Sequence, residues 1–229
     1  MAQAKAMLLD VDGTLVDSND AHARAWVEVL AEFKPASFER VRELIGKGGD
    51  KLLPEVTGIA NESELAQTIK ARRKALFMQK YLPHLRPFPK VRELLERFRA
   101  DGLALIIATS AGEEEMHALV QVAGIADLLD NKASSGDAAR SKPDPDIVTA
   151  ALQRAQVSPE EAWMLGDTPY DVEASQRAGV KMIALRSGGW GDEDLAGAEV
   201  IYENAAELLT RYNSSPLAQG ALKLSASVG

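Results

Sequence analysis

Short apolar runs alternate with amphipathic helical patterns along most of this 229-residue chain, and this alternation constrains the fold more than any other feature. The runs are continuously apolar, as is typical of parallel strands that are buried on both faces. Such runs predict strands at Ala6–Val11, Leu103–Thr109, Ala162–Leu165 and Val180–Leu185, and weaker patterns predict strands at Leu129–Ala133 and Glu199–Tyr202. Helices are expected at Phe88–Ala100, Glu113–Ala123, Pro145–Gln156 and Asp171–Ala178. This order predicts an α/β fold with a Rossmann-like, doubly wound parallel sheet.

One interval, from about Asn19 to about Leu85, contains no convincing strand. Helical patterns occupy it at Ala21–Phe33, Phe38–Ile45, Asp50–Val56 and Glu62–Tyr81. We therefore expect residues 18–86 to form a small all-helical cap domain, inserted into a discontinuous core of residues 1–17 and 87–212. Residues 213–229 are rich in Ser, Ala and Gly without periodicity, which predicts a disordered or loosely packed tail.

The composition excludes several classes of function. A net charge of −8 argues against nucleic acid or an anionic membrane surface as the main partner. The absence of cysteine excludes disulfides, zinc–thiolate sites and thiol catalysis. No apolar run approaches the roughly 18 residues of a membrane span, so a cytoplasmic protein is expected. The low aromatic content, 5%, indicates no clear interface, and a monomer is expected.

Two carboxylates stand one residue apart directly after the first apolar run, in Asp10-Val11-Asp12-Gly13-Thr14. Each repels the other and resists desolvation, so a compensating cation or a chemical task is expected. A Mg²⁺-dependent phosphoryl-transfer site would supply both. In such a site, Asp10 could attack phosphorus and Asp12 could transfer a proton.

Two further segments place polar groups at strand ends. At Thr109-Ser110-Ala111 a strand gives way to a helix, and such a turn directs free N–H groups towards an anion, although capping alone also explains these residues. Gly166-Asp167-Thr168-Pro169-Tyr170-Asp171 follows another strand, and its two carboxylates suit Mg²⁺. Because all these ends belong to parallel strands, they are expected to converge at one edge of the sheet.

Taken in order, these segments resemble the motifs of the haloacid dehalogenase-like superfamily, in its phosphoglycolate phosphatase and β-phosphoglucomutase-like branch. The resemblance adds Lys142, in Ser141-Lys142-Pro143, as the lysine of the third motif. It implies a Mg²⁺-dependent phosphatase that acts on a small phosphorylated metabolite through an aspartyl-phosphate. Asp10 would be the nucleophile and Asp12 the acid and base, while Thr109, Ser110, Ala111 and Lys142 would bind phosphate. Asp10, Asp12, Asp167 and Asp171 would hold the metal, with Asp171 either orienting Asp167 or acting as a ligand itself.

The substrate and two alternatives stay open. A β-phosphoglucomutase-like enzyme would share all four motifs and the cap, and a non-catalytic phosphate-binding module would share the fold. Inside the expected cap, Lys47 and Gly48 lie in a glycine-rich connection that could border the substrate, or could simply join two helices. His22 and Arg24, at the start of the cap, are further candidates for lining the cleft.

Overall fold

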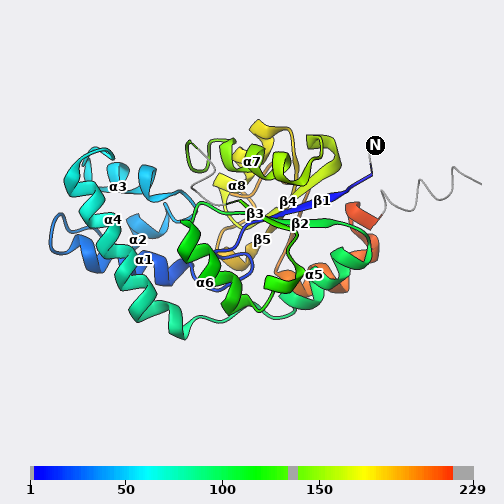
Figure 1. The fold of residues 1–229 in the computed structure, drawn as a ribbon, viewed down its shortest axis with the longest axis horizontal. Helices are drawn as coiled ribbons and strands as arrows, with labels where there is room; N and C mark the ends of the chain where they lie inside the picture. Colours follow the sequence, from blue (N-terminus) through cyan, green and yellow to red (C-terminus); the bar gives the residue numbers. More distant parts are fainter. Residues whose placement is uncertain (1–2, 134–138, 219–229) are drawn as a thin grey trace, which may run out of the picture.

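A single parallel sheet forms the centre of the molecule (Figure 1). The computed structural model describes residues 3–133 and 139–218. The strands lie in the order β3-β2-β1-β4-β5-β6. Their bounds are β1 (Ala6–Leu9), β2 (Ala104–Ala108), β3 (Asn131–Ala133), β4 (Ala162–Gly166), β5 (Lys181–Leu185) and β6 (Val200–Tyr202). All six predicted strands are therefore confirmed, and their order has the switch next to β1 that is characteristic of doubly wound sheets.

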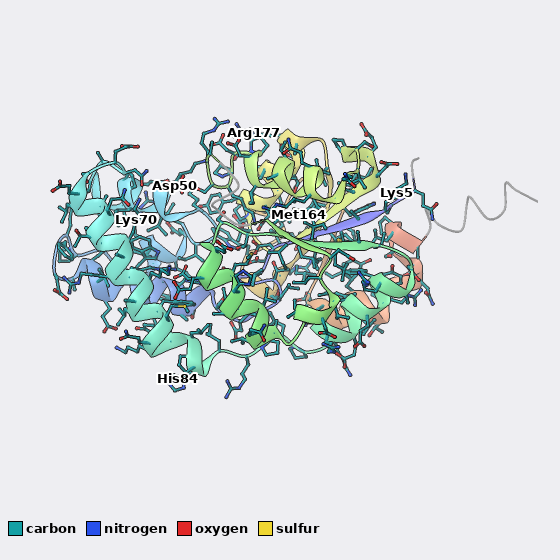
Figure 2. The ribbon with its side chains drawn as sticks, viewed as in Figure 1. Lys5, Asp50, Lys70, His84, Met164 and Arg177 are labelled. Atoms are coloured by element: carbon teal, nitrogen blue, oxygen red, sulfur yellow. The ribbon has the colours of Figure 1, made fainter. Side chains whose placement is uncertain are left out.

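Helices cover both faces of this sheet, because successive side chains of each strand point to opposite faces. In β1, Met7 and Leu9 join one apolar cluster, to which α5, α6 and α9 contribute. Ala6 and Leu8 join a second cluster, with α7 and α8. Figure 2 shows Met164 of β4 in the interior of this core, and its side chain is fully buried. The helices are α1 (Asn19–Leu30), α2 (Phe38–Arg42), α3 (Gly49–Thr57), α4 (Glu64–Leu76), α5 (Val91–Ala100), α6 (Glu113–Ala123), α7 (Asp146–Ala155), α8 (Pro169–Ala178) and α9 (Ala205–Thr210).

The helices α1 to α4 form a separate group beside the carboxyl edge of the sheet, blue to cyan in Figure 1. They surround an apolar cluster of their own, whose members include Trp26, Leu30, Leu52 and Ile69. We call this group the helical cap. Its formation from a continuous stretch between β1 and β2 agrees with the expected architecture, and the exact domain bounds of 18 and 86 stay a prediction.

Several predicted boundaries are wrong in detail. The first strand ends at Leu9, so Asp10 to Asp12 lie in the following loop. The long cap helix stops at Leu76 and continues as a π-helical turn, Phe77–Tyr81. The short helix α9 was not expected.

Part of the expected tail is packed. Leu217 and Ala218 are buried, because their apolar side chains join the apolar cluster to which α5 and α9 also contribute. Residues 219–229 of the expected tail lie outside the described residues. Within the described part of the chain, none of the helices has the length and apolar character needed to cross a bilayer.

Candidate active site

Asp10 and Asp167 lie side by side at the carboxyl edge of the sheet. Asp10 follows β1 and Asp167 follows β4, and these neighbouring parallel strands pair Leu9 with Leu165. The backbone N–H of Asp10 extends this pairing by donating to the carbonyl of Leu165, at 2.9 Å. Two carboxylates that are far apart in the sequence are thus brought together by strand register.

Lys142 lies beside Asp10 and Asp171 and is almost fully buried, with 1% of its surface exposed. Its Nζ forms ion pairs with Asp10 Oδ1 at 2.5 Å and with Asp171 Oδ1 at 2.7 Å. Burial by itself would lower the pKa of Lys142, but the two carboxylates outweigh it and raise that pKa above its ordinary value. Lys142 therefore stays charged and neutralises part of the negative cluster.

Negative charge still exceeds positive charge in this cluster. Burial raises the pKa of Asp10 to about 7, and the charges of Asp171 and Asp12 add to this, although Lys142 opposes it. The pKa of Asp167 is also raised well above its usual value, first by burial and then by the charges of Asp10 and Asp171. A cation placed among these groups would relieve both shifts.

The donor set fits such a cation. Asp10, Asp167 and Asp171 are all buried, and each offers a carboxylate oxygen that lies within 4.8 Å of the others. Oxygen-only ligands from a few carboxylates suit a hard divalent ion. Asp171 also caps helix α8, since its Oδ2 accepts from the N–H and the hydroxyl of Thr168.

Asp167 is held by side chains that the sequence did not single out. The hydroxyl of Thr14 donates to Oδ1 at 2.7 Å, and the amide of Asn19 donates to Oδ2 at 2.9 Å. Two glycines leave room for this carboxylate: a Cβ on Gly13 would lie 2.2 Å from Asp167 Oδ2, and one on Gly188 only 1.7 Å. Gly13 also has a φ of +76°, which favours glycine.

Asp12 points away from this cluster, towards the helical cap. Its Oδ1 accepts a hydrogen bond from Ser18 Oγ at 2.5 Å and lies 2.7 Å from His22 Nε2. Burial alone would raise the pKa of Asp12, but His22, Ser18 and Arg73 together outweigh it, and the pKa is lowered. The side chain of Asp12 is thus not among the three grouped carboxylates, so any contact with a metal would come from its backbone.

The predicted phosphate-binding turn, Thr109 to Ala111, borders the same cavity as Asp10 and Asp12. Thr109 is buried, and its Oγ1 accepts from the backbone N–H of Ala111 at 3.1 Å, so this N–H already has a partner. The hydroxyl of Ser110 is buried and has no hydrogen-bond partner among the described residues. The turn can therefore offer the two hydroxyls to an anion more readily than the N–H of Ala111.

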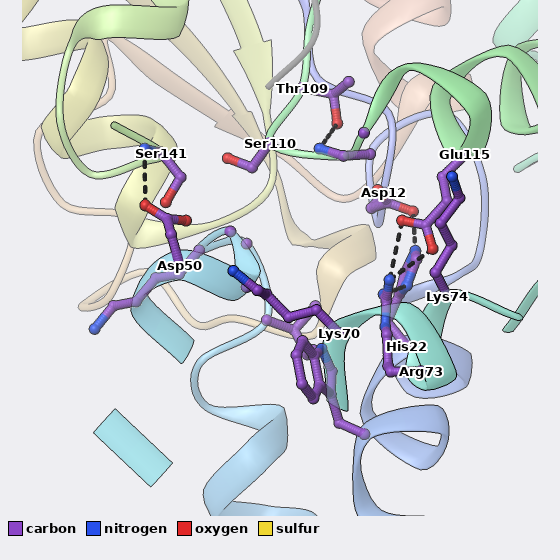
Figure 3. A pocket seen from close by; sticks show the side chains of 18 of the residues that line it. Asp12, His22, Asp50, Lys70, Arg73, Lys74, Thr109, Ser110, Glu115 and Ser141 are labelled. Carbon is purple, nitrogen blue, oxygen red and sulfur yellow. Dashed lines mark hydrogen bonds and ion pairs between the residues drawn. The ribbon is translucent and has the colours of Figure 1, made fainter. Parts of the chain in front are cut away.

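A cavity of about 400 Å³ brings these parts together between the sheet edge and the cap (Figure 3). Asp10, Asp12 and Thr109 to Ala111 line its core side. His22, Lys47 and Gly48 line its cap side. A Cβ on Gly48 would lie 2.6 Å from that of Ser141, so the cap loop touches the core next to Lys142.

Two cap residues that were expected to line the cleft, Lys47 and Arg24, have other contacts. Lys47 pairs with Glu55 at 2.5 Å and lies over the ring of Tyr170, so its charge is already partly satisfied. Arg24 is exposed and lies over the ring of Phe38, away from the cavity. Of the cap candidates, His22 has the most direct contact with the core.

Comparisons with known proteins agree with this arrangement. The model of the haloacid dehalogenase-like hydrolase family matches residues 7–185. This chain belongs to that family. As a haloacid dehalogenase-like hydrolase, it is an enzyme.

Individual relatives are similar over most of their length. A phosphoglycolate phosphatase of Rhodospirillum rubrum is 30% identical over 215 residues, covering 89% of each chain. The pyrophosphatase PpaX of Bacillus velezensis is 28% identical, covering 89% of this chain and 94% of its own. The crystal structure of a hydrolase from Pseudomonas syringae has a TM-score of 0.85 and 28% identity, covering 92% of this chain and 98% of that one.

Sequence reasoning missed several residues of this hydrolase's site. Ser18 and Asn19 directly follow the first motif, and their polarity at the start of an otherwise amphipathic helix was a signal that could have been used. Arg73 and Glu115 also border the cavity, but they come from different helices and no spacing connects them. Gly188 lies in a loop for which the sequence suggested no role.

Proposed function

We propose that this enzyme is a Mg²⁺-dependent phosphomonoester hydrolase that acts on a small phosphorylated metabolite through an aspartyl-phosphate on Asp10. One observation carries the proposal: Asp10 and Asp12 border the same cavity, yet only Asp10 contacts Lys142 and the other grouped carboxylates. One carboxylate is thus placed for attack on phosphorus, and its neighbour is free to transfer protons. Relatives named as phosphoglycolate phosphatase and pyrophosphatase support the reaction class.

In the first step, a carboxylate oxygen of Asp10 forms a bond to phosphorus while the bond to the leaving ester oxygen breaks. Asp12 is ionised in the free enzyme, so it first takes the proton carried by the phosphate monoanion of the ester and then gives it to that oxygen, which leaves as an alcohol. The hydroxyls of Thr109 and Ser110 and the ammonium of Lys142 bind the equatorial oxygens. The result is an aspartyl-phosphate on Asp10 and an ionised Asp12.

In the second step, water attacks the same phosphorus. Asp12 accepts a proton from that water as the bond between Asp10 and phosphorus breaks. Inorganic phosphate is released, Asp10 returns to a carboxylate and Asp12 is again protonated, so the net reaction consumes one ester and one water.

Asp10 and Asp167 would hold Mg²⁺, with Asp171 behind them and the backbone carbonyl of Asp12 beside them. The bound ion would supply positive charge where the phosphate and the Asp10 carboxylate, both anionic, meet. On the cap, Lys47 and Gly48 would border the part of the substrate remote from phosphorus.

The test is phosphate release from a panel of phosphomonoesters, measured with Mg²⁺ and with EDTA. The panel includes phosphoglycolate and β-glucose 1-phosphate. We expect Mg²⁺-dependent release, and we expect Asp10→Asn to lower it by more than about 10⁴-fold because an amide is a poor nucleophile. Asp192→Asn, an exposed aspartate paired with Arg186, should not change it.

Retention of activity by Asp10→Asn would place the nucleophile elsewhere. Conversion of β-glucose 1-phosphate to glucose 6-phosphate without phosphate release would indicate a mutase. No turnover of any ester, with phosphate still bound, would indicate a binding module.

A further inference from the structure

Glu115 is a buried carboxylate that the proposed reaction does not use. It lies in the first turn of α6 and borders the cavity, with 6% of its side chain exposed. Both its oxygens accept from one nitrogen of Arg73, Nη1, at 2.6 and 2.9 Å. Arg73 comes from α4 of the cap, so this ion pair joins the cap to the core, as Figure 3 shows.

The other terminal nitrogen of Arg73, Nη2, contacts Nδ1 of His22. A guanidinium has donors only, so Nδ1 of His22 must be the acceptor and carries no proton. The ring proton therefore lies on Nε2. Stacking on Phe77, with ring centroids 3.9 Å apart, holds the imidazole plane in this orientation.

The Nε2–H of His22 then donates to Oδ1 of Asp12, at 2.7 Å. Ser18 Oγ lies 2.5 Å from the same oxygen and donates to it too. Among the described residues, no hydrogen bond reaches Oδ2 of Asp12. The two carboxylate oxygens are thus unlike: Oδ1 accepts twice, and Oδ2 is left for the cavity that Asp12 lines.

We infer that Arg73 and Glu115 are positioning residues that, through His22, make Oδ2 of Asp12 the oxygen that transfers protons. Arg73 sets which ring nitrogen of His22 carries the proton, and Glu115 sets the orientation of Arg73. Neither residue touches the reacting atoms. The inference rests on the proposed function of Asp12 as acid and base.

A purely structural role for the ion pair makes a different prediction. If Arg73 and Glu115 only fastened the cap, their loss would weaken every step of the reaction alike. If they position Asp12, their loss affects only steps in which a proton moves. The two steps of p-nitrophenyl phosphate hydrolysis separate these cases, because p-nitrophenolate leaves without needing a proton, whereas water must lose one to attack.

The experiment is rapid-mixing kinetics with Mg²⁺ and p-nitrophenyl phosphate, which reports a burst of p-nitrophenolate followed by a steady state. In Arg73→Gln we expect the burst rate to stay within about 3-fold of wild type and the steady-state rate to fall by more than about 10-fold, because the second step needs Asp12 as a base. Glu115→Gln should change the rates in the same direction but less. Asp12→Asn gives the reference pattern.

Neighbouring residues supply matched controls. Glu114, beside Glu115 on α6, is exposed and pairs with Lys74, and Arg72, beside Arg73 on α4, is exposed and pairs with Glu32. Glu114→Gln and Arg72→Gln should leave both phases unchanged. His22→Gln should retain more activity than His22→Leu, because a glutamine amide can also donate to Asp12 and accept from Arg73.

Equal losses in burst and steady state for Arg73→Gln and Glu115→Gln, or no loss in either, would overturn the inference. Failure of the proposed function would look different. In that case Asp10→Asn would turn over p-nitrophenyl phosphate like wild type.

Discussion

Asp10 and Asp12 are separated by one residue, yet the two carboxylates have almost entirely different partners. Asp10 contacts Lys142 of the core and shares its surroundings with Asp167 and Asp171. Asp12 contacts Ser18 and His22, at the start of the cap. Burial raises the pKa of Asp10 to about 7, whereas the partners of Asp12 overcome burial and lower its pKa.

The difference shows how one loop can supply two chemical roles. The side chains of Asp10 and Asp12 turn in opposite directions after β1, so one enters the core and the other faces the cap. Each environment then sets the charge of its own carboxylate. The difference between the two aspartates can be tested at Asp10, because the residues that contact Asp10 can be changed without altering those that contact Asp12.

The largest effect on stability is expected from Lys142→Met. This change removes the buried cation that contacts Asp10 and Asp171 and leaves like charges facing each other. We expect a loss of about 3–5 kcal/mol in the free energy of unfolding, measured with urea at neutral pH. Lys51→Met is the control, because Lys51 pairs with Asp144 nearer the surface and should contribute at most about 1 kcal/mol. If Lys142→Met left the free energy of unfolding unchanged, Asp10 and Asp171 would not both be ionised in the folded protein.

A smaller effect is expected from Mg²⁺, and it should depend on pH. Between pH 3.8 and about 7, the folded metal-free protein keeps a proton on Asp10 that the unfolded chain has released, so raising the pH in this window costs stability. Mg²⁺ binds the ionised form. The stabilisation by Mg²⁺ should therefore grow across the same window, reaching about 2.7 kcal/mol at a hundred times its dissociation constant.

Urea unfolding with MgCl₂ and with EDTA, at pH 5 and at pH 7, checks this prediction. Taking the difference between the two conditions cancels the groups that lie away from the metal, and Asp167, whose pKa is also raised, adds to the same trend. An equal Mg²⁺ effect at both pH values would contradict the shifted pKa of Asp10.

The smallest effect is expected from Gly188→Ala, which tests the room left for Asp167. The new Cβ would lie 1.7 Å from Asp167 Oδ2, so the loop or the carboxylate must move, at a cost of about 1–3 kcal/mol. The Mg²⁺-dependent part of the stability should shrink as well. Gly191→Ala is the matched control, since the nearest atom to its Cβ would be 3.6 Å away. Wild-type Mg²⁺ dependence in Gly188→Ala would show that Asp167 does not hold the metal.

Much of the core could be predicted because its signals are local. Strands buried on both faces need continuous apolar runs, and the four such runs all became strands, as did the two weaker patterns. The helix α9 was missed because six residues carry too little periodicity to stand out. Leu217 and Ala218 were assigned to a loose tail because the apolar cluster that buries them consists of residues distant in the chain.

The residues of the site also divide into those with a local signal in the sequence and those without one. Asp10, Asp12 and Asp167 were candidates from the sequence because each follows a strand end, and Lys142 was added by the family resemblance. Arg73 and Glu115 were not, because their ion pair joins two helices that are 42 positions apart in the chain.

The sequence by itself determined the α/β sheet, the helical cap and the identity of the carboxylates and lysine at the sheet edge. These features depend on residues that lie close together in the chain, through side-chain period, chain turns and motif spacing. Only the tertiary structure decided which side chain each carboxylate faces. Hydrogen bonds such as those from Arg73 to Glu115 and His22, and the closeness of Gly188 to Asp167, act over a few ångströms between distant positions, and no local pattern in the chain records them.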